Sequence, residues 1–331
     1  MILSEEIKQA IFTISGENDF ENIALKIFRY QVTANRIYDD FCRALGILPE
    51  KVMHLQEIPF MPVGFFRDHR VISGNRDDFE KIFRSSGTTA SVSSQHFVKD
   101  LQLYRESFTR SFSLYYGDPG HFRFLALLPG YLERQDSSLV YMMDSFIRLT
   151  AGNGSGFFLH DLDALQKRLL ETNDGATRTI LFGASYALLD FAELYPSDLS
   201  GITVMETGGM KGRKREMIRE ELHEILCHRF NIGGIHSEYG MTELLSQAYS
   251  QGDGLFRTPP WMKVMIRDTN DPMHFLPPGK TGGINIIDLA NLHSCAFIAT
   301  QDLGKLQPDG SFEVLGRFDD SDIRGCNLLV V

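Results

Sequence analysis

The sequence predicts an α/β fold with mostly parallel strands. Three observations lead to this prediction: apolar strand patterns at 122–130, 177–185 and 202–209, a turn directly after each, and an amphipathic helical pattern at 211–230. The repeated order of strand, turn and helix is typical of a sheet that is covered by helices. After residue 236, glycine and proline become frequent and apolar runs shorten, which predicts a smaller β-rich part with hairpins.

The segments before the first of these strands predict helices and one connector. Residues 4–47 are expected to be helical, because the apolar residues from Phe20 to Phe28 follow helical spacing and a glycine ends the pattern. The segment 58–69 contains two prolines at a spacing that a helix does not tolerate well, so we expect an extended connector there. A helical pattern resumes from 96 to 115.

The composition limits the partners and the compartment. The 331 residues include 33 Lys and Arg against 43 Asp and Glu, which gives a formal net charge of −10. Nucleic acid is therefore not expected as the main partner, because phosphate backbones need clustered basic residues. The sequence has no apolar run of about 20 residues and no CxxC motif, and we do not expect its first residues to be a signal peptide. We therefore expect a cytoplasmic protein without a membrane span.

Two motif matches are interpreted as structural features. The Gly-Lys-Thr at 279–281 lacks the earlier glycine of a P-loop, because His274 stands at that position. His223 and His228 are five residues apart, whereas two imidazoles on one helix face need a spacing of four. We interpret His223 and His228 as surface or capping histidines.

A third motif match concerns a serine. Ser185 follows a strand in the pattern Gly-x-Ser-x-Ala, which is close to the nucleophile elbow of hydrolases. A catalytic triad would also need a later Asp and His, and the candidates, Asp302 and His293, do not follow the expected order convincingly. The alternative is that Ser185 caps a helix at a strand–helix turn.

The hydroxyl-rich segment FRSSGTTASVSS, residues 83–94, predicts a phosphate-binding loop or a flexible linker. Gly87 can adopt a positive φ, so that neighbouring N–H groups converge on one point. The hydroxyl donors beside it are Ser85, Ser86, Thr88 and Thr89. Serine-rich loops are also common linkers, so this segment alone does not decide between the two.

Three later segments favour a nucleotide site. In YGMTE, Tyr239 can stack on a base, Thr242 can hydrogen-bond an α-phosphate, and Glu243 can bind Mg²⁺. In TQDLG, Asp302 can accept hydrogen bonds from both ribose hydroxyls, and in LGRFDD, Arg317 can contact the ribose or a phosphate. Each residue has an ordinary structural alternative, but the four segments together favour nucleotide binding.

This set resembles the adenylate-forming superfamily of acyl-CoA synthetases and nonribosomal peptide adenylation domains. The matching motifs are SSGTT, YGMTE, TQDLG and GRFDD…RG, and they span residues 85–325. More narrowly, the segments IPFMPVGFF, ETGGMKGR and RGCNLL resemble the acyl-protein synthetase family of bacterial luminescence.

The resemblance implies a layered αβαβα large domain with a smaller β-rich subdomain, and the C-terminal small domain of most relatives is expected to be absent. Residues 1–315 would form the AMP-binding catalytic domain, with a helical part at 1–80, an α/β part at 81–235 and a β-rich part at 236–315. Residues 316–331 would form the hinge motif and a short tail.

The resemblance also implies the reaction. An enzyme of this family uses ATP and Mg²⁺ to convert a carboxylic acid, here a fatty acid, into an acyl-adenylate and then passes the acyl group to a thiol. The thiol would belong to the protein itself, to an acyl-carrier protein or to CoA, and a reductase is a further candidate partner. Thr242 would take part in catalysis, and the cofactor-binding glycines and tyrosine would be Gly208, Gly209, Tyr239 and Gly240.

The sequence departs from the family at the loop lysine, because Ala90-Ser91-Val92 follows the threonines. Lys211 is the candidate replacement cation, with Arg213 or Lys214 behind it. The alternative is a solvated basic helix start.

The resemblance places the acyl acceptor near the C-terminus. Cys326 lies two residues after Arg324, and a nearby guanidinium favours the nucleophilic thiolate. The alternative is that Cys326 is a small apolar residue that docks the tail. Two other functions stay open at this point: a nucleotide-binding relative without catalysis, and a serine acyltransferase or hydrolase that uses Ser185.

Overall fold

The computed structural model describes residues 2–86, 93–130, 132–150, 152–172, 177–208 and 217–318. The chain forms two compact units, which we describe separately. Unit 1 comprises Met1–Phe79, Phe97–Lys99 and Pro260–Val331, and unit 2 comprises Glu80–His96 and Asp100–Pro259. These units join segments that are far apart in the sequence, whereas the expected parts 1–80, 81–235 and 236–315 are consecutive, and those parts stay a prediction.

Unit 1 begins with the expected helices. They are α1 (Ile2–Ile11), α2 (Glu17–Ala34) and α3 (Arg36–Ala44). Asn35 separates α2 from α3, and its side-chain oxygen accepts hydrogen bonds from the backbone N–H groups of Ile37 and Tyr38, as an N-cap residue does. The helical prediction for 4–47 is therefore confirmed.

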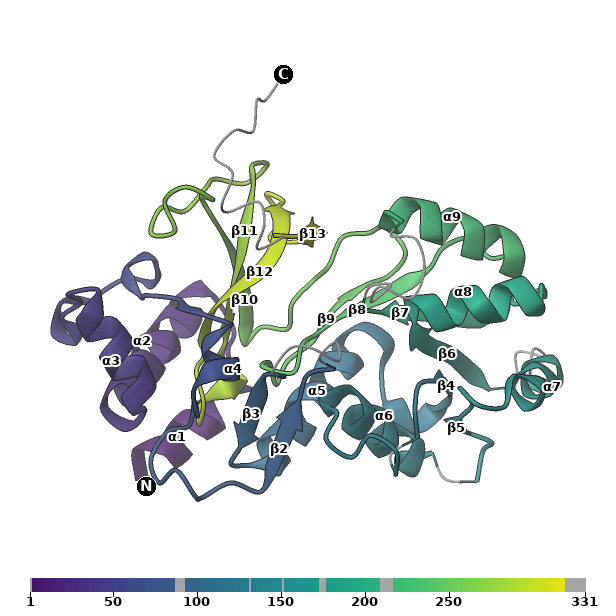
Figure 1. Ribbon diagram of the computed structural model, residues 1–331, viewed down its shortest axis with the longest axis horizontal. Helices are drawn as coiled ribbons and strands as arrows, with labels where there is room; N and C mark the ends of the chain where they lie inside the picture. Colours follow the sequence, from purple (N-terminus) through teal and green to yellow (C-terminus); the bar gives the residue numbers. More distant parts are fainter. Residues whose placement is uncertain are drawn as a thin grey trace. The chain divides into compact units, whose positions relative to one another are not determined.

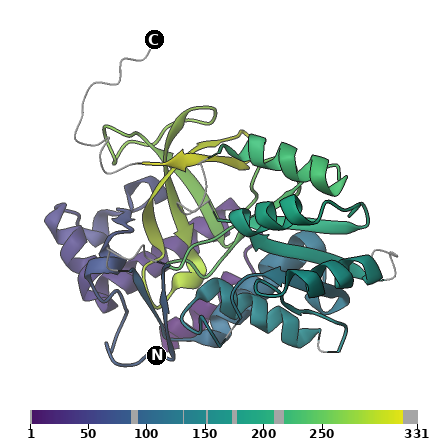
Figure 2. The ribbon, with the colours of Figure 1, turned by 45° about the vertical axis from the view of Figure 1, so that its right-hand side comes forward.

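The prediction of a β-rich later part holds for residues 260–318, which lie in unit 1, whereas 236–259 belong to unit 2. The sheet of unit 1 has the order β1-β12-β11-β10, and β13 pairs with β12. The strands are β1 (Met61–Pro62), β10 (Met262–Arg267), β11 (Thr281–Asp288), β12 (Phe297–Leu306) and β13 (Phe312–Arg317). All pairs are antiparallel except β1 with β12. Figure 2 shows the purple N-terminal helices beside these green and yellow strands, and the rings of Phe28 and Tyr38 contact Phe297.

The prediction of an extended connector at 58–69 is wrong in its second half. Strand β1 includes Pro62, but the one-turn helix α4 (Phe65–Asp68) follows it. The backbone N–H of Val63 donates to the carbonyl of Ala299, which ends the extended segment against β12. No proline follows Pro62 here, so nothing prevents a helical turn.

Unit 2 contains the expected parallel sheet, with the order β5-β4-β6-β7-β8-β9. The strands are β4 (Phe122–Leu127), β5 (Gly156–Phe157), β6 (Arg178–Ala184), β7 (Ile202–Thr207), β8 (His236–Tyr239) and β9 (Ala248–Ser250). All pairs are parallel except β8 with β9. Three of these strands are the segments from which the fold was predicted.

Helices cover both faces of this sheet. Helices α8 (Ser185–Leu194) and α9 (Arg219–Phe230) lie on one face, and α5 (Leu101–Tyr116) and α6 (Ser138–Leu149) lie on the other (Figure 1). Helix α7 (Leu162–Thr172) precedes β6.

The short remaining elements are the paired strands β2 (Lys81–Arg84) and β3 (Gln95–Val98) and the 3-10 turns η1 (Pro49–Lys51), η2 (Leu55–Glu57), η3 (Pro119–His121) and η4 (Leu289–Asn291).

Two predicted helix starts are wrong. The helix expected from residue 96 begins at Leu101, because residues 95–98 form β3 and the Asp100 carboxylate accepts from the Leu103 N–H as an N-cap. The helix expected at 211–230 begins at Arg219, and 211–216 lie outside the described residues. Glu220 and Glu221 occupy its first turn, which the helix dipole favours, whereas a basic run is disfavoured there. No helix in the described segments is long and apolar enough to span a bilayer.

Candidate active site

The YGMTE motif forms a turn at the end of β8 in unit 2. Tyr239 is the last residue of that strand and is 9% exposed, and its ring lies edge-on to Phe256 with 5.9 Å between the ring centroids. Glu243 is 6% exposed. The carboxyl ends of parallel strands are where α/β sheets bind ligands, so the turn lies at the edge expected of a site.

A buried histidine anchors this turn. The Nδ1–H of His96 donates to the carbonyl oxygen of Thr242 at 2.8 Å. Burial lowers the pKa of His96 to about 4, so its imidazole is neutral near pH 7. Sequence analysis missed His96, and the only signal for it is a histidine in a short apolar strand directly after the hydroxyl-rich loop.

The hydroxyl-rich loop is closed at its base by two serines. The backbone N–H of Ser85 donates to the carbonyl of Ser94 at 3.1 Å, and the backbone N–H of Ser94 donates to Oγ of Ser85 at 3.0 Å. Ser86 is exposed. Gly87, Thr88 and Thr89 lie outside the described residues, so phosphate binding by this loop stays a prediction.

The end of β7 is organised around the buried carboxylate of Glu206, which is 3% exposed. Its Oε2 accepts from the Ser185 hydroxyl at 2.9 Å, and its Oε1 lies 3.4 Å from Nε of Arg219 and 3.7 Å from Nε2 of His223. Burial acts to raise the pKa of Glu206, but the nearby His223 imidazole, the charge of Arg219 and the hydroxyls of Ser237 and Ser185 together outweigh it, so the pKa lies below its ordinary value.

This carboxylate network fixes the turn after β7. The Ser185 hydroxyl also donates to the carbonyl of Gly208, and Gly208 has a φ of +68°, which favours glycine. Gly209 and Lys211 lie outside the described residues. The roles predicted for Gly208, Gly209 and Lys211 therefore stay predictions.

The same network corrects two interpretations. Ser185 is not the cap of α8, because the N-cap is Ala184 and no side chain caps this end. The partners of the Ser185 hydroxyl are a carboxylate and a carbonyl, not the imidazole that a serine nucleophile needs. His223 is not a surface or capping residue, since it contacts Glu206, whereas His228 is exposed.

A second buried carboxylate, Glu238, lies beside the motif glycine. The Thr207 hydroxyl donates to its Oε2. Burial, with a smaller contribution from the charge of Glu206, raises the pKa of Glu238 to about 7. A Cβ atom on Gly240 would lie 2.4 Å from Oε1 of Glu238, so Gly240 has a packing reason to be glycine, and its role in cofactor binding stays a prediction.

In unit 1 the structure brings together the two residues predicted to contact the ribose. Asp302 on β12 is the register partner of Arg317 on β13. The Nε–H of Arg317 donates to Oδ1 of Asp302 at 3.0 Å. Asp302 is 7% exposed, whereas the Arg317 side chain is 72% exposed. The arginine can therefore move without loss of packing, and the carboxylate is fixed.

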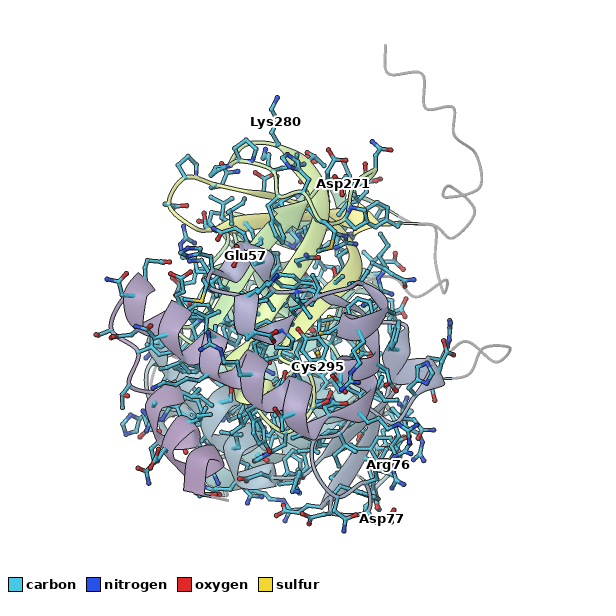
Figure 3. The ribbon with its side chains drawn as sticks, turned by 90° about the vertical axis from the view of Figure 1, so that its left-hand side faces the viewer. Glu57, Arg76, Asp77, Asp271, Lys280 and Cys295 are labelled. Atoms are coloured by element: carbon cyan, nitrogen blue, oxygen red, sulfur yellow. The ribbon has the colours of Figure 1, made fainter. Side chains whose placement is uncertain are left out.

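The remaining candidates include one rejected motif and the cysteines. Lys280 is exposed and extends from the turn before β11 (Figure 3), which is unlike a P-loop lysine at a helix start. Cys42 and Cys295 are buried and Cys227 is half-buried, as expected for residues that fill space. Cys326 lies outside the described residues.

Comparisons with known proteins bear on this arrangement. No family model matches the chain. The chain is 22% identical over 322 residues to a long-chain-fatty-acid–luciferin-component ligase of Vibrio harveyi, which covers 91% of this chain and 84% of that protein. A ligase of the same name from Aliivibrio fischeri is 22% identical over 364 residues, covering 99% of this chain and 94% of its own.

Solved structures share the fold. A 2-hydroxyisobutyryl-CoA ligase in complex with 2-HIB-AMP and CoA matches with a TM-score of 0.67 at 13% identity, covering 93% of this chain and 70% of its own. The chain has the fold of the adenylate-forming ligases. ATP-bound MatB from Rhodopseudomonas palustris matches with a TM-score of 0.55 at 18% identity and covers 74% of this chain, which spans 49% of the MatB length.

These matches confirm the predicted resemblance to adenylate-forming ligases and the α/β fold class with parallel and antiparallel sheets. They do not favour a serine hydrolase or a relative without catalysis. The contacts of Ser185 likewise do not support a serine hydrolase.

Proposed function

We propose that this protein is an ATP-dependent ligase that activates a carboxylic acid as an acyl-adenylate and transfers the acyl group to a thiol. The observation that carries the proposal is that the YGMTE turn follows a buried parallel strand in a chain with the adenylate-forming fold. A fatty acid is the favoured substrate, because both curated relatives are named as ligases of long-chain fatty acids.

The reaction has two steps. A carboxylate oxygen of the acid attacks the α-phosphorus of ATP, a new O–P bond forms, and the bond to the bridging oxygen breaks so that pyrophosphate leaves. A thiolate, formed when the acceptor thiol loses its proton, then attacks the acyl carbon. The C–O bond to AMP breaks, which leaves a thioester and free AMP.

The residues of unit 2 would hold the base and the phosphates. Tyr239 would stack on adenine, and the Thr242 hydroxyl would hydrogen-bond the α-phosphate. Because His96 anchors the Thr242 carbonyl, the position of that hydroxyl is set by a buried group. The outer phosphates would lie against Ser85, Ser86, Gly87, Thr88 and Thr89, and the adenylate would lie against Gly208, Gly209 and Gly240.

Glu243 would hold the magnesium ion. Mg²⁺ at nucleotide sites prefers one or two carboxylates together with substrate phosphates, and Glu243, which directly follows Thr242 in the sequence, offers such a hard oxygen donor. When bound, Mg²⁺ supplies positive charge that screens the phosphates. Lys211 would add a second cation near the developing charge on pyrophosphate.

In unit 1, Asp302 would accept hydrogen bonds from the ribose hydroxyls and Arg317 would contact the ribose or a phosphate. Support comes from their exposure, since the Asp302 carboxylate is fixed in β12 and the Arg317 side chain is largely open to solvent. The acceptor thiol would be Cys326, an acyl-carrier protein or CoA. A reductase that consumes the acyl group is a further candidate partner.

ATP–pyrophosphate exchange with a panel of carboxylic acids, from short to long chain, tests this proposal. We expect exchange that depends on a fatty acid and on Mg²⁺. Intact mass after incubation with ATP, Mg²⁺ and the best acid should show one acyl adduct, and Cys326→Ser should remove it. The matched control is Cys227→Ser, a half-buried cysteine on α9, which should retain the adduct.

The two measurements separate the parts of the proposal. Exchange with none of the acids would contradict the ligase. Exchange together with an adduct that survives Cys326→Ser would leave the ligase intact and exclude Cys326 as the acceptor.

A further inference from the structure

Arg267, the last residue of β10, lies across the neighbouring strands of unit 1. Its Nη1 donates to the Ile284 carbonyl at 2.8 Å and to Oδ1 of Asn285 at 2.7 Å, and its Nη2 donates to the Thr300 carbonyl at 2.6 Å. One guanidinium therefore holds β11 and β12 together at this level of the sheet. Sequence analysis did not single out this residue.

The sheet leaves space for this guanidinium at a glycine. Gly283 is the register partner of Arg267, and a Cβ atom on Gly283 would lie 2.4 Å from Cζ of Arg267. Such a distance excludes any other side chain unless the arginine moves. The backbone of β11 is thus adapted to a flat group that lies over it.

Thr300 connects Arg267 to Asp302. Besides its carbonyl contact with Arg267, Thr300 donates its hydroxyl to the Ile284 carbonyl at 2.8 Å, and its Oγ1 accepts from the Asp302 N–H at 3.0 Å. Arg267 and Thr300 therefore donate to the same acceptor, the Ile284 carbonyl. The Thr300 hydroxyl oxygen also holds the backbone N–H of Asp302. Burial lowers the pKa of Arg267 while the charge of Asp302 opposes that change, as expected for neighbouring opposite charges.

Arg267 also contacts the residue that follows β13. The ring centroid of Phe318 lies 5.7 Å from the Arg267 guanidinium, and the Phe318 N–H donates to the Gln301 carbonyl at 2.8 Å. Gln301 directly precedes Asp302 in β12. The two residues that precede Asp302 in β12 are thus both tied to contacts with Arg267, Thr300 directly and Gln301 through Phe318.

We infer that Arg267 is a positioning residue that holds the Asp302 carboxylate in place for the ribose hydroxyls of ATP. The inference rests on the proposed function, because Asp302 meets a ribose only if a nucleotide binds. Arg267 does not need to touch the nucleotide. It acts through Thr300 and Gln301, the two residues that precede Asp302, and through its own charge.

The preference for ATP over 2′-deoxy-ATP tests this inference, because it reports the hydrogen bond from the ribose hydroxyl to Asp302. We expect the wild-type protein to prefer ATP by roughly 10- to 100-fold, as for hydrogen bonds to a charged acceptor. The preference is measured as the ratio of kcat/KM in pyrophosphate exchange and as the ratio of Kd by calorimetry. Asp302→Asn should abolish it, and Arg267→Met should reduce it to within about threefold of that variant.

Further variants separate positioning from general loss of structure. Arg267→Lys keeps the charge and loses the planar fork, so it should retain an intermediate preference. Thr300→Val removes the hydroxyl that bonds Asp302 and should lower the preference even if Arg267→Met fails to fold. Arg76→Met, at an exposed position of the same unit (Figure 3), should leave the preference unchanged. Combining Arg267→Met with Asp302→Asn should cause no further loss of preference.

The outcomes distinguish this inference from the proposed function. An equal loss of kcat/KM with both nucleotides in Arg267→Met, at an unchanged ratio, overturns the positioning role. Absence of exchange together with a calorimetric preference that Arg267→Met removes overturns the ligase and supports the inference. A wild-type protein that binds neither nucleotide overturns both.

Discussion

Each unit contains a charged group near its candidate site residues, buried Glu206 in unit 2 and half-buried Arg267 in unit 1, and the two charges are held differently. Glu206 in unit 2 is surrounded by side chains, namely the Ser185 hydroxyl, Arg219 and His223. Arg267 in unit 1 is held mainly by backbone carbonyls of β11 and β12. The carboxylate therefore depends on neighbouring side chains that can be removed or titrated, whereas the guanidinium depends on the sheet itself.

This difference predicts how each unit responds when its charged residue is substituted or the pH is changed. Removing Glu206 takes away the carboxylate beside the Arg219 guanidinium, and removing one member of an ion pair inside a fold is costly. The carbonyls around Arg267 are neutral, so this part of unit 1 should respond to shape more than to pH. The predictions below test the comparison through charge removal, titration and added volume.

The largest effect is expected from Glu206→Ala. It leaves Arg219 and His223 without this carboxylate and removes one of the two acceptors of the Ser185 hydroxyl, so the free energy of unfolding should fall by about 3–5 kcal/mol. Glu206→Gln keeps an acceptor and should cost less, about 1–3 kcal/mol. Urea unfolding followed by circular dichroism measures both.

The control is Glu224→Ala, which removes an exposed carboxylate from the same helix as Arg219 and His223. It should change the free energy of unfolding by less than about 0.5 kcal/mol. If Glu206→Ala is as mild as this control, the view of Glu206 as the organising charge of unit 2 is wrong.

A smaller effect is expected from the titration of Glu238, whose pKa is raised from 4.5 to about 7. Between these values the unfolded chain has released the proton and the folded protein still binds it, so stability falls as the pH rises. Wild-type stability should therefore decrease relative to Glu238→Gln by up to about 1.4 kcal/mol per pH unit in this window and become constant above it.

Urea unfolding at several pH values from 4 to about 8 checks this. Glu206, whose pKa is lowered, has the opposite sign: its contribution is present above about pH 4.5 and is lost on further acidification. Parallel curves for the wild-type protein and Glu238→Gln across the window would show that Glu238 is not held in its protonated form.

The smallest effects are expected from added methyl groups at two crowded glycines, one in each unit. Gly283→Ala would clash with Arg267, and Gly240→Ala with Glu238, each at 2.4 Å. We expect losses of about 2 kcal/mol and about 1 kcal/mol, respectively, because three hydrogen bonds hold the guanidinium while the Glu238 carboxylate can rotate. Thermal and urea unfolding measure both.

Gly233→Ala is the matched control, since no atom lies within 4 Å of an added Cβ there. It should be neutral within about 0.5 kcal/mol. A larger loss at Gly240 than at Gly283 would show that the Glu238 carboxylate resists displacement more than the Arg267 guanidinium does.

The sheet of unit 2 could be predicted from the sequence because its strands are continuous apolar runs. Strands β4, β6 and β7 are buried on both faces, and such strands are apolar at nearly every position. The helix starts could not be predicted in the same way. The side chain of Asp100 and the charges of the first turn of α9 set them, and helical periodicity alone does not show where these act.

The candidate site could be predicted only where its residues are close in sequence. The YGMTE turn is one short segment, and Asp302 and Arg317 stand in two others, but the pairing of these two residues across a hairpin was not predicted. His96 was missed because its partner, Thr242, lies 146 residues later. Arg267 was missed because its importance comes from the space over Gly283 and from the carbonyl of Thr300, and neither is visible in the sequence around it.

The interrupted course of unit 1 has a consequence for synthesis on the ribosome. The side chain of Gln31 in α2 donates to the carbonyl of Asn291, which is 260 residues later in the chain. At 5–20 residues per second, the N-terminal helices must wait roughly 13–50 s for this partner. Unit 2 is encoded almost entirely within that interval and can fold first. We expect a released chain that ends at residue 259, where unit 2 ends, to contain a protease-resistant unit 2 and protease-sensitive helices α1–α3.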